Sequence, residues 1–167
     1  MGISTVEIRF LAEEDLELVT KRFPFGGPAK HAQRLQWQRN DSALYLLAWL
    51  EGEPVGHLLI QWHGAQSVPF YTGCPDIEDF FVAYGMRSQG IGSLLLAQAE
   101  EQARQRGYSA IGLSVATRNE RAQALYKRLG YRQWGPGPYL LKGTYVDALG
   151  KRQFWQDECL YLIRTLD

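Results

Sequence analysis

A glycine-rich stretch near the middle of the chain has the composition of a phosphate-binding loop. Residues 85–93 read GMRSQGIGS and follow the strand-like run IEDFFV. Glycines let a ligand approach the backbone, and a helix that begins near Gln89 would offer unpaired N–H groups and the positive end of its dipole. Arg87 adds a cation. These features predict a diphosphate site, and taken alone they fit a plain strand-to-helix turn equally well.

The loop matches neither of the two most common phosphate-binding patterns. A P-loop requires a lysine after its second glycine, and here Ile91 follows Gly90. A dinucleotide fingerprint that starts at Gly90 and Gly92 requires a third glycine where Leu95 stands. The pattern therefore favours neither an NTPase nor a dinucleotide enzyme.

The elements that must position this loop form a mixed α/β pattern. The strongest helix signal follows the loop, with Ile91, Leu94, Leu95 and Ala99 as its predicted buried stripe and Gly107 as its C-cap. The periodicities predict strands at residues 5–11, 43–50, 54–63, 76–82, 109–115, 131–134 and 157–166, and helices at 12–23, 29–40, 91–107 and 118–130. Residues 135–156 fit either a hairpin or a loop. An antiparallel N-terminal half should therefore meet parallel strands near the glycine loop.

Composition restricts the class of protein. The 167 residues carry 18 Lys and Arg against 18 Asp and Glu, so no wholesale binding to nucleic acid or to an anionic membrane is expected. The chain shows no repeat, linker or apolar stretch of membrane-spanning length. We expect a single domain over residues 1–167 in the cytoplasm.

The cysteines and histidines offer little chemistry by their spacing. Cys74 and Cys159 lie far apart without a preceding signal peptide, which favours two reduced thiols. Cys74 could instead be an acyl-carrying nucleophile, but no histidine follows it at a recognisable spacing. The three histidines lack metal-ligand spacing, so no metal is expected.

Two motifs in register resemble those of the acyl-CoA N-acyltransferase (GNAT) superfamily. Residues 87–92, RSQGIG, fit the [RQ]-x-x-G-x-[GA] signature, and residues 119–131 fit N-x-x-A-x-x-L-Y-x-x-x-G-[FY]. The resemblance implies an α/β (α+β) fold with a mixed central sheet of about seven strands. Such a fold has an antiparallel N-terminal meander, splayed fourth and fifth strands, a bulge in the fourth strand and helices on both faces.

The resemblance also implies acetyl-CoA as the acyl donor, with no metal. The positions that match the family's coenzyme site are Phe81, Val82, Arg87, Ser88, Gln89, Gly90, Ile91, Gly92, Ser93, Asn119, Ala122 and Tyr126. Ser88 replaces a glycine often found there. The N–H of Val82 is the expected donor to the thioester oxygen. Asn119 also suits an N-cap, and one or two cations of the basic helix 118–130 could meet the coenzyme's 3′-phosphate.

Catalytic roles follow from the same resemblance. Tyr126 matches the general acid that protonates the leaving thiolate, although its spacing also fits a core tyrosine. An alkylammonium substrate must lose a proton before it attacks, and Glu78, directly or through a water, is the leading candidate base, with Asp79 next. On a regular strand these two carboxylates would point to opposite faces.

The acceptor is expected to be a small-molecule primary amine that attacks directly in a ternary complex. The run IEDFFV is similar to a segment of the diamine (polyamine) acetyltransferases, and Asp76, Glu78 and Asp79 favour a cation. The segments predicted to wall the acceptor pocket are residues 64–75 and Phe23, Phe25, Trp134, Tyr139, Tyr145, Phe154 and Trp155. The alternatives are a protein N-terminus or lysine as acceptor, and a non-catalytic acyl-CoA sensor. Superfamily members are often dimers, so a homodimer is also open.

Overall fold

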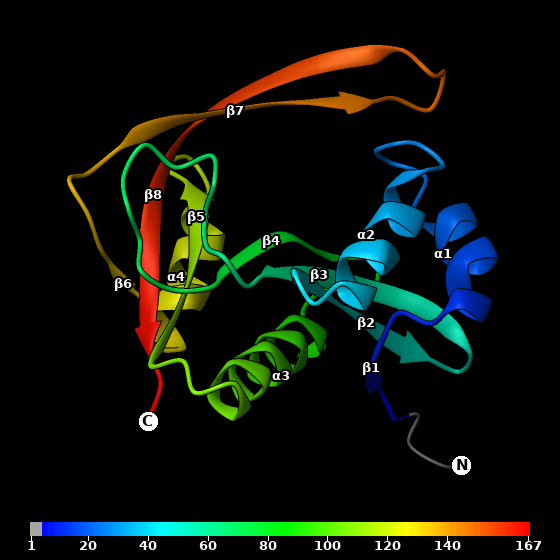
Figure 1. Cartoon of the computed structure of the whole chain (residues 1–167), viewed down its shortest axis with the longest axis horizontal. Helices are drawn as coiled ribbons and strands as arrows, with labels where there is room; N and C mark the ends of the chain where they lie inside the picture. The colour runs from blue at the N-terminus through cyan, green and yellow to red at the C-terminus, as the bar shows by residue number, and fades with distance from the viewer. Residues whose placement is uncertain (1–4) are drawn as a thin grey trace.

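The computed structural model describes residues 5–167, so residues 1–4 of the expected domain lie outside the described part (Figure 1). Its strands are β1 (Glu7–Phe10), β2 (Ala43–Leu50), β3 (Glu53–Gln61), β4 (Asp76–Val82), β5 (Ala110–Ala116), β6 (Arg132–Gln133), β7 (Tyr139–Val146) and β8 (Arg152–Thr165). Its helices are the short 3-10 helix η1 (Glu13–Asp15) and the α-helices α1 (Leu16–Arg22), α2 (Lys30–Arg39), α3 (Ile91–Gln105) and α4 (Glu120–Arg128).

The described strands form one mixed sheet, which confirms the predicted fold class. The order is β1-β2-β3-β4-β5-β8-β6, and β7 pairs with β8 beside this path. Strands β1 to β4 form the expected antiparallel meander, and β4 and β5 are parallel. The described part of the sheet has eight strands rather than about seven because β7 is a separate strand.

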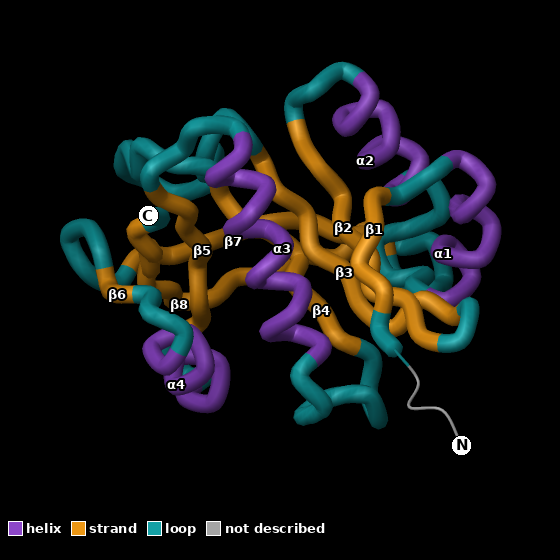
Figure 2. The backbone as a smooth tube through the Cα atoms, turned by 90° about the horizontal axis from the view of Figure 1, so that it is seen from below, coloured by secondary structure: helices purple, strands orange, loops and turns teal. Residues whose placement is uncertain are grey.

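Helices cover both faces of the sheet because the side chains of β2 alternate between two apolar clusters. Leu46 belongs to the cluster that contains Leu95 of α3, whereas Leu47 belongs to the cluster with Val19 of α1 and Leu35 of α2. Tyr126 of α4 packs in the first cluster, so α3 and α4 share a face. Figure 2 shows α3 lying across the middle strands, with α1 and α2 together at the β1–β3 end.

One residue of the predicted α3 stripe is placed differently. Ile91, Leu95 and Ala99 are buried, as predicted, but Leu94 is exposed. The stripe advances by four residues at each step, and Leu94 lies roughly 100° around the helix from Leu95. Leu94 therefore faces away from the sheet.

Strand β4 carries the bulge that the family resemblance implies. Opposite β3, His57 pairs with Phe81 and Leu59 pairs with Glu78, so two residues of β4 face the single residue Leu58. Asp79, the first of the two, has a left-handed backbone with φ of 49°. The extra residue shifts the alternation of β4 by one position.

The gap between β4 and β5 opens directly after the first residues of β4. Their parallel pairing covers Asp76 with Gly112 and Ile77 with Leu113, and no further pairs join the two strands. The second half of β4 is therefore free of β5. This splay confirms the predicted separation of the fourth and fifth strands.

Residues 135–156 adopt the hairpin of the two conformations that the sequence allowed. The last strand begins at Arg152, earlier than the predicted residue 157, because it continues as the partner of β7. The hairpin reaches over to the connection between α1 and α2 (Figure 1). There the Gly26 N–H donates to Val146 O at 3.2 Å, and the rings of Phe25 and Tyr145 stack at 4.6 Å.

Candidate active site

The glycine loop ends at the N-terminus of α3 with an open space in front of its backbone. Gly90 is the N-cap of α3 and has φ of 81°, and a Cβ placed on it would meet no atom within 4 Å. Ser88 also adopts a left-handed backbone, with φ of 65°, which costs a non-glycine residue roughly 1–2 kcal/mol. Space is tight at Gly92, because a Cβ there would lie 3.1 Å from Phe80 Cζ and the ring would have to move by a few tenths of an ångström. The loop can therefore receive an anion against its backbone.

A cavity of about 700 Å³ lies between this loop, the second half of β4 and α4. All the predicted coenzyme positions except Gln89 line it, namely Phe81, Val82, Arg87, Ser88, Gly90, Ile91, Gly92, Ser93, Asn119, Ala122 and Tyr126. The Gln89 side chain donates instead to Gly85 O at 3.4 Å, within the loop itself. Two motifs that are about 30 residues apart in the sequence thus form one cavity.

Cations line the 700 Å³ cavity, which we call the coenzyme cavity. Arg87 donates from Nε to Val82 O at 2.9 Å and stacks over the Tyr84 ring at 4.1 Å. Arg121 of α4 donates to Ser88 Oγ at 2.6 Å and, with Arg128, lines the cavity. The donor set of backbone N–H groups, a hydroxyl and guanidinium groups fits a phosphorylated ligand. The basic face of α4 is therefore partly directed at the site.

The backbone of Val82 faces the gap between β4 and β5. The Ala83 N–H donates to Val55 O at 2.8 Å, so Ala83 directs its N–H toward β3 in this antiparallel pair. In such a ladder the neighbouring residue points its N–H and C=O the other way. The N–H of Val82 is therefore directed into the gap, where it can donate to a ligand.

Tyr126 is both a core residue and part of the cavity lining. Its ring packs in the core, 5.8 Å from that of Tyr131 and 6.4 Å from that of Phe80, and the residue also lines the coenzyme cavity. Burial raises the pKa of Tyr126 to about 12, so its hydroxyl keeps its proton at neutral pH. Asn119 also has a structural contact and a place in the cavity lining. Its Oδ1 caps α4 by accepting from the Ala122 N–H at 3.1 Å.

A second cavity, of about 780 Å³, lies on the other side of the first half of β4. We call it the acceptor cavity; its walls come from β4, α2, the β3–β4 connection and the β7–β8 hairpin, and it contains Asp76, Glu78 and Asp79. The bulge explains why Glu78 and Asp79 share this side, since the left-handed backbone of Asp79 breaks the alternation.

Only some of the predicted aromatic walls line the acceptor cavity. Phe25, Tyr145 and Trp155 line it. The predicted wall residues that lie elsewhere are Phe23, which packs in the α1–α2 core, Tyr139, which packs against Tyr161, Trp134, which packs against Phe70, and Phe154, which is exposed. Alternation along β8 turns Phe154 to the face opposite Trp155, whereas Tyr139 shares the face of Tyr145 but lies at the other end of β7.

Asp76 and Glu78 form a hydrogen-bonded carboxyl pair in the acceptor cavity. They are two residues apart on β4, and the Tyr161 hydroxyl donates to Asp76 Oδ1 at 2.9 Å. Burial and the charge of Glu78 raise the pKa of Asp76 to about 8. Burial also raises the pKa of Glu78, but hydrogen bonds from Asp76 and Gln61 oppose this rise. Both pKa values are raised, and the hydrogen bond between the two carboxyls favours the proton on Asp76 over Glu78.

Glycine at 112 makes room for the hydroxyl that supports this pair. A Cβ at Gly112 would lie 2.4 Å from the Tyr161 Oη, so any larger residue would displace the tyrosine. Tyr161 comes from β8, on the far side of β5 from β4. A residue two strands away in the same sheet thus positions the carboxyl pair.

Asp79 is held in ion pairs. Its Oδ2 lies 2.8 Å from Lys30 Nζ and 2.7 Å from Arg34 Nη1. Burial alone would raise the pKa of Asp79, but His57, Arg34 and Lys30 together hold it well below its usual range. Burial lowers the pKa of His57 to about 4, so the cations that face Asp79 at neutral pH are Lys30 and Arg34. Asp79 is therefore a poor proton acceptor there.

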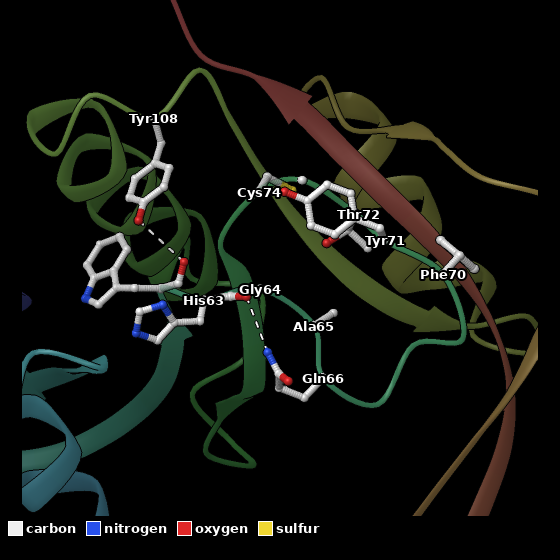
Figure 3. Close-up of a pocket in the computed structure, with 11 residues that line it drawn as sticks. His63, Gly64, Ala65, Gln66, Phe70, Tyr71, Thr72, Cys74 and Tyr108 are labelled. Atoms are coloured by element: carbon white, nitrogen blue, oxygen red, sulfur yellow. Dashed lines mark hydrogen bonds between the residues drawn. The ribbon is translucent and has the colours of Figure 1, made fainter.

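A third cavity, of about 430 Å³, lies beside the β3–β4 connection and contains Cys74 with Thr72 and Tyr71 (Figure 3). Cys74 is buried, with its Sγ 4.0 Å from the Tyr161 Oη. Burial raises the pKa of the Cys74 thiol to about 11, so almost none of it is thiolate at neutral pH.

We therefore expect the Cys74→Ala variant to keep a kcat close to that of the wild type. Steady-state kinetics with a saturating amine would measure it. The matched observation is the mass of the intact protein after incubation with acetyl-CoA alone. An acetyl group on Cys74 would contradict direct transfer.

Comparison with known proteins identifies the family of this arrangement. The family model for the acetyltransferase (GNAT) family matches residues 11–131. The chain belongs to the GNAT acetyltransferase family. Within this family, the chain is 39% identical over 89 residues to the aminoalkylphosphonate N-acetyltransferase of Salmonella typhimurium, covering 53% of this chain and 56% of that protein.

The chain is also similar to two further proteins. It is 29% identical over 126 residues to the streptothricin acetyltransferase of Streptomyces lavendulae, covering 75% of this chain and 64% of that one. It thus spans less than two thirds of the length of both curated relatives. The PaiA N-acetyltransferase of Thermoplasma acidophilum, solved in complex with coenzyme A, has the same fold, with a TM-score of 0.69 at 15% identity over 96% of this chain and 99% of that one.

Sequence reasoning missed three side chains around the acceptor cavity: Lys30, Arg34 and Tyr161. Lys30 and Arg34 are four residues apart on one face of α2. The sequence shows this spacing, but it does not show that the face lies against Asp79. Tyr161 has the pattern of an ordinary buried strand residue.

Among residues 5–167, no helix is long and apolar enough to span a bilayer, and no cluster of His, Cys, Asp or Glu is placed to bind a metal ion.

Proposed function

We propose that this GNAT protein transfers an acetyl group from acetyl-CoA to a primary amine of a small molecule. The amine attacks directly in a ternary complex, and residues 1–167 act as one catalytic domain. The observation that carries the proposal is that β4 lines two cavities. Its first half carries the carboxyl pair into the acceptor cavity, and its second half carries Phe81 and Val82 into the coenzyme cavity.

The residues of the coenzyme cavity fit the diphosphate and thioester of acetyl-CoA. The open backbone at Gly90 and the guanidinium groups of Arg87 and Arg121 suit the phosphates. The N–H of Val82 would donate to the thioester oxygen, where negative charge develops. Coenzyme A in the Thermoplasma acidophilum structure supports this donor.

Proton transfer falls to Glu78 and Tyr126 in this proposal. Glu78, ionised beside protonated Asp76, accepts a proton from the ammonium group directly or through a water. Tyr126 lines the coenzyme cavity with its hydroxyl protonated, so it can donate to the departing thiolate. Asp79, held by two cations, is not assigned the role of base.

The shape of the acceptor cavity favours a small molecule over a peptide. The β7–β8 hairpin closes over the cavity and is joined to the α1–α2 connection by the Gly26–Val146 hydrogen bond and the Phe25–Tyr145 stack. An extended peptide would need this bridge to open. Two relatives carry names that specify small-molecule amines, aminoalkylphosphonate and streptothricin. A non-catalytic sensor would have no use for the carboxyl pair and Tyr126 together.

The test is a panel of amines, aminoglycosides and lysine-containing peptides incubated with acetyl-CoA. We expect release of free thiol with small primary amines and little or none with the peptides. Turnover of peptides alone would move the acceptor to the protein class. Tight binding of acetyl-CoA without turnover of any compound would favour the sensor.

A further inference from the structure

Two cations of α2 line the acceptor cavity, and the proposed chemistry does not use them. Lys30 and Arg34 are four residues apart, so they project from the same face of the helix. Their side chains are only 13% and 12% exposed. Placing two cations in a partly closed cavity is unfavourable unless anions compensate them.

The protein supplies fewer anions than these cations require. Lys30 and Arg34 both contact the same oxygen, Oδ2 of Asp79, so two positive charges share one negative charge. Asp157 also lines the cavity, but Arg118 binds both of its carboxylate oxygens, at 3.0 and 3.1 Å. This end of the cavity therefore retains about one positive charge.

The other end of the acceptor cavity has the opposite balance. With Asp76 protonated, the carboxyl pair carries one negative charge. Within residues 5–167 neither carboxyl forms an ion pair with Lys or Arg, although Arg34 is near enough to lower the pKa of Glu78. Glu78 and Asp79 are adjacent in β4, so the negative and positive ends lie next to each other. A molecule of a few bonds could contact both ends at once.

The cations also keep hydrogen-bond donors for a ligand. A guanidinium group has five N–H donors, and Arg34 uses Nη1 for Asp79 while its plane stacks over the Tyr45 ring at 4.9 Å. Lys30 has three N–H donors, and two of its contacts are known: Asp79 Oδ2, and Phe25 O at 3.1 Å. One donor therefore remains for a ligand. Burial and the neighbouring Arg34 lower the pKa of Lys30, against the opposing effect of Asp79. A bound anion would relieve this repulsion.

We propose that the acceptor is a small zwitterion, with its primary amine at Asp76 and Glu78 and a carboxylate or phosphonate group at Lys30 and Arg34. This inference rests on the proposed acetyl transfer and names the class of amine. It makes Lys30 and Arg34 determinants of substrate specificity. The competing explanation is that the two cations serve only to fix Asp79 at the bulge.

The experiment compares three matched amines: β-alanine, 2-aminoethylphosphonate and n-propylamine, which lacks the acidic group. For the wild type we expect kcat/KM for at least one of the two acidic amines to exceed that for n-propylamine by about tenfold or more, the effect of one charge-assisted contact. Comparison of the two acidic amines shows whether carboxylate or phosphonate is preferred.

Variants separate specificity from structural support. In Arg34→Gln and, independently, Lys30→Gln, we expect this preference ratio to fall by about tenfold. Arg39→Gln is the control, because Arg39 is an exposed cation of the same helix that pairs with Glu13 outside the cavity, and its ratio should not change. An equal loss for acidic and uncharged amines in both variants would show that the cations only fix Asp79 and would overturn the proposal.

Calorimetric titration keeps the inference separate from the proposed function. Each amine is titrated into the wild-type protein saturated with coenzyme A, and binding is measured without turnover. If no amine is acetylated, acetyl transfer to small amines is wrong, while tighter binding of β-alanine or 2-aminoethylphosphonate than of n-propylamine still supports the zwitterion site. Equal binding of all three amines would overturn it, whatever the activity.

Discussion

The Tyr126→Phe variant is expected to lose about 10²–10⁴-fold in kcat while its affinity for acetyl-CoA changes little. The variant keeps the ring that packs against Phe80 and Tyr131 and removes only the hydroxyl. Because the pKa of Tyr126 is raised to about 12, the hydroxyl is a proton donor rather than an acceptor at neutral pH. Rapid kinetics with saturating amine, together with calorimetric titration of acetyl-CoA, would measure both quantities.

Tyr131→Phe provides the matched control for this result. The Tyr131 hydroxyl is buried nearby without a hydrogen-bond partner among the described residues, and Tyr131 does not line the coenzyme cavity. Removing it should leave kcat unchanged and cost no stability, because an unsatisfied polar group is lost. A Tyr126→Phe variant as active as Tyr131→Phe would show that Tyr126 is only a core residue.

The Glu78→Gln variant should lose about 10²–10⁴-fold in kcat/KM at neutral pH, because the amide cannot accept the proton of the ammonium group. Glu101→Gln is a suitable control, since Glu101 is an α3 carboxylate that interacts with Arg104 and Gln105 away from both cavities. Retention of activity by Glu78→Gln would leave deprotonation to solvent or to backbone groups.

Asp76 determines where the acidic limb of the pH profile lies. The hydrogen bond from Asp76 lowers the pKa of Glu78, and Glu78 acts only when it is deprotonated, so kcat/KM should rise with pH through its titration. Asp76→Ala removes this donor, raises the pKa of Glu78 and should move the limb to higher pH. Asp76→Asn keeps a donor and should leave the limb near its wild-type position.

Both variants must be compared with the wild type on one amine, so that the ionisation of the substrate is common to all three profiles. If Asp76→Ala and Asp76→Asn shift the limb equally, the hydrogen bond is not what positions the proton. In that case the negative charge of Asp76, and not its donor, would matter.

The coenzyme half of the site could be predicted from the sequence because its signals are local. Backbone geometry at Gly90 and the N-cap at Asn119 follow from residue types within one loop or one turn. The strand 76–82 and the two motif helices were also predicted within a few residues, since their apolar periodicity is strong.

The carboxylates of the acceptor half and some of its aromatic walls were predicted, but the contacts that hold them could not be, because these contacts join distant residues. Arg34 meets Asp79 across 45 positions, and Tyr161 meets Asp76 across 85. The hairpin of residues 135–156 was ambiguous because Leu140 lies on the exposed face of β7 with Lys142 and Thr144, so the alternation of apolar and polar residues along β7 is incomplete. The family resemblance implied the bulge, but residue type gives only a weak signal for its position: aspartate is one of the residues that more often adopt a left-handed backbone, as Asp79 does.

The single extra residue at Asp79 has a consequence for how this protein can change. Beyond it, Phe80 and Val82 share the α3 face with Ile77, whereas Phe81 joins the α1–α2 cluster. Deleting one residue there would restore uniform alternation and exchange these faces, so donor binding would fail even though every motif residue remained. Substitutions in the first half of β4, before Asp79, can alter the choice of amine without disturbing the binding of the acyl donor. Deletion of one residue at the bulge is thus expected to be more damaging than a substitution in the first half of β4.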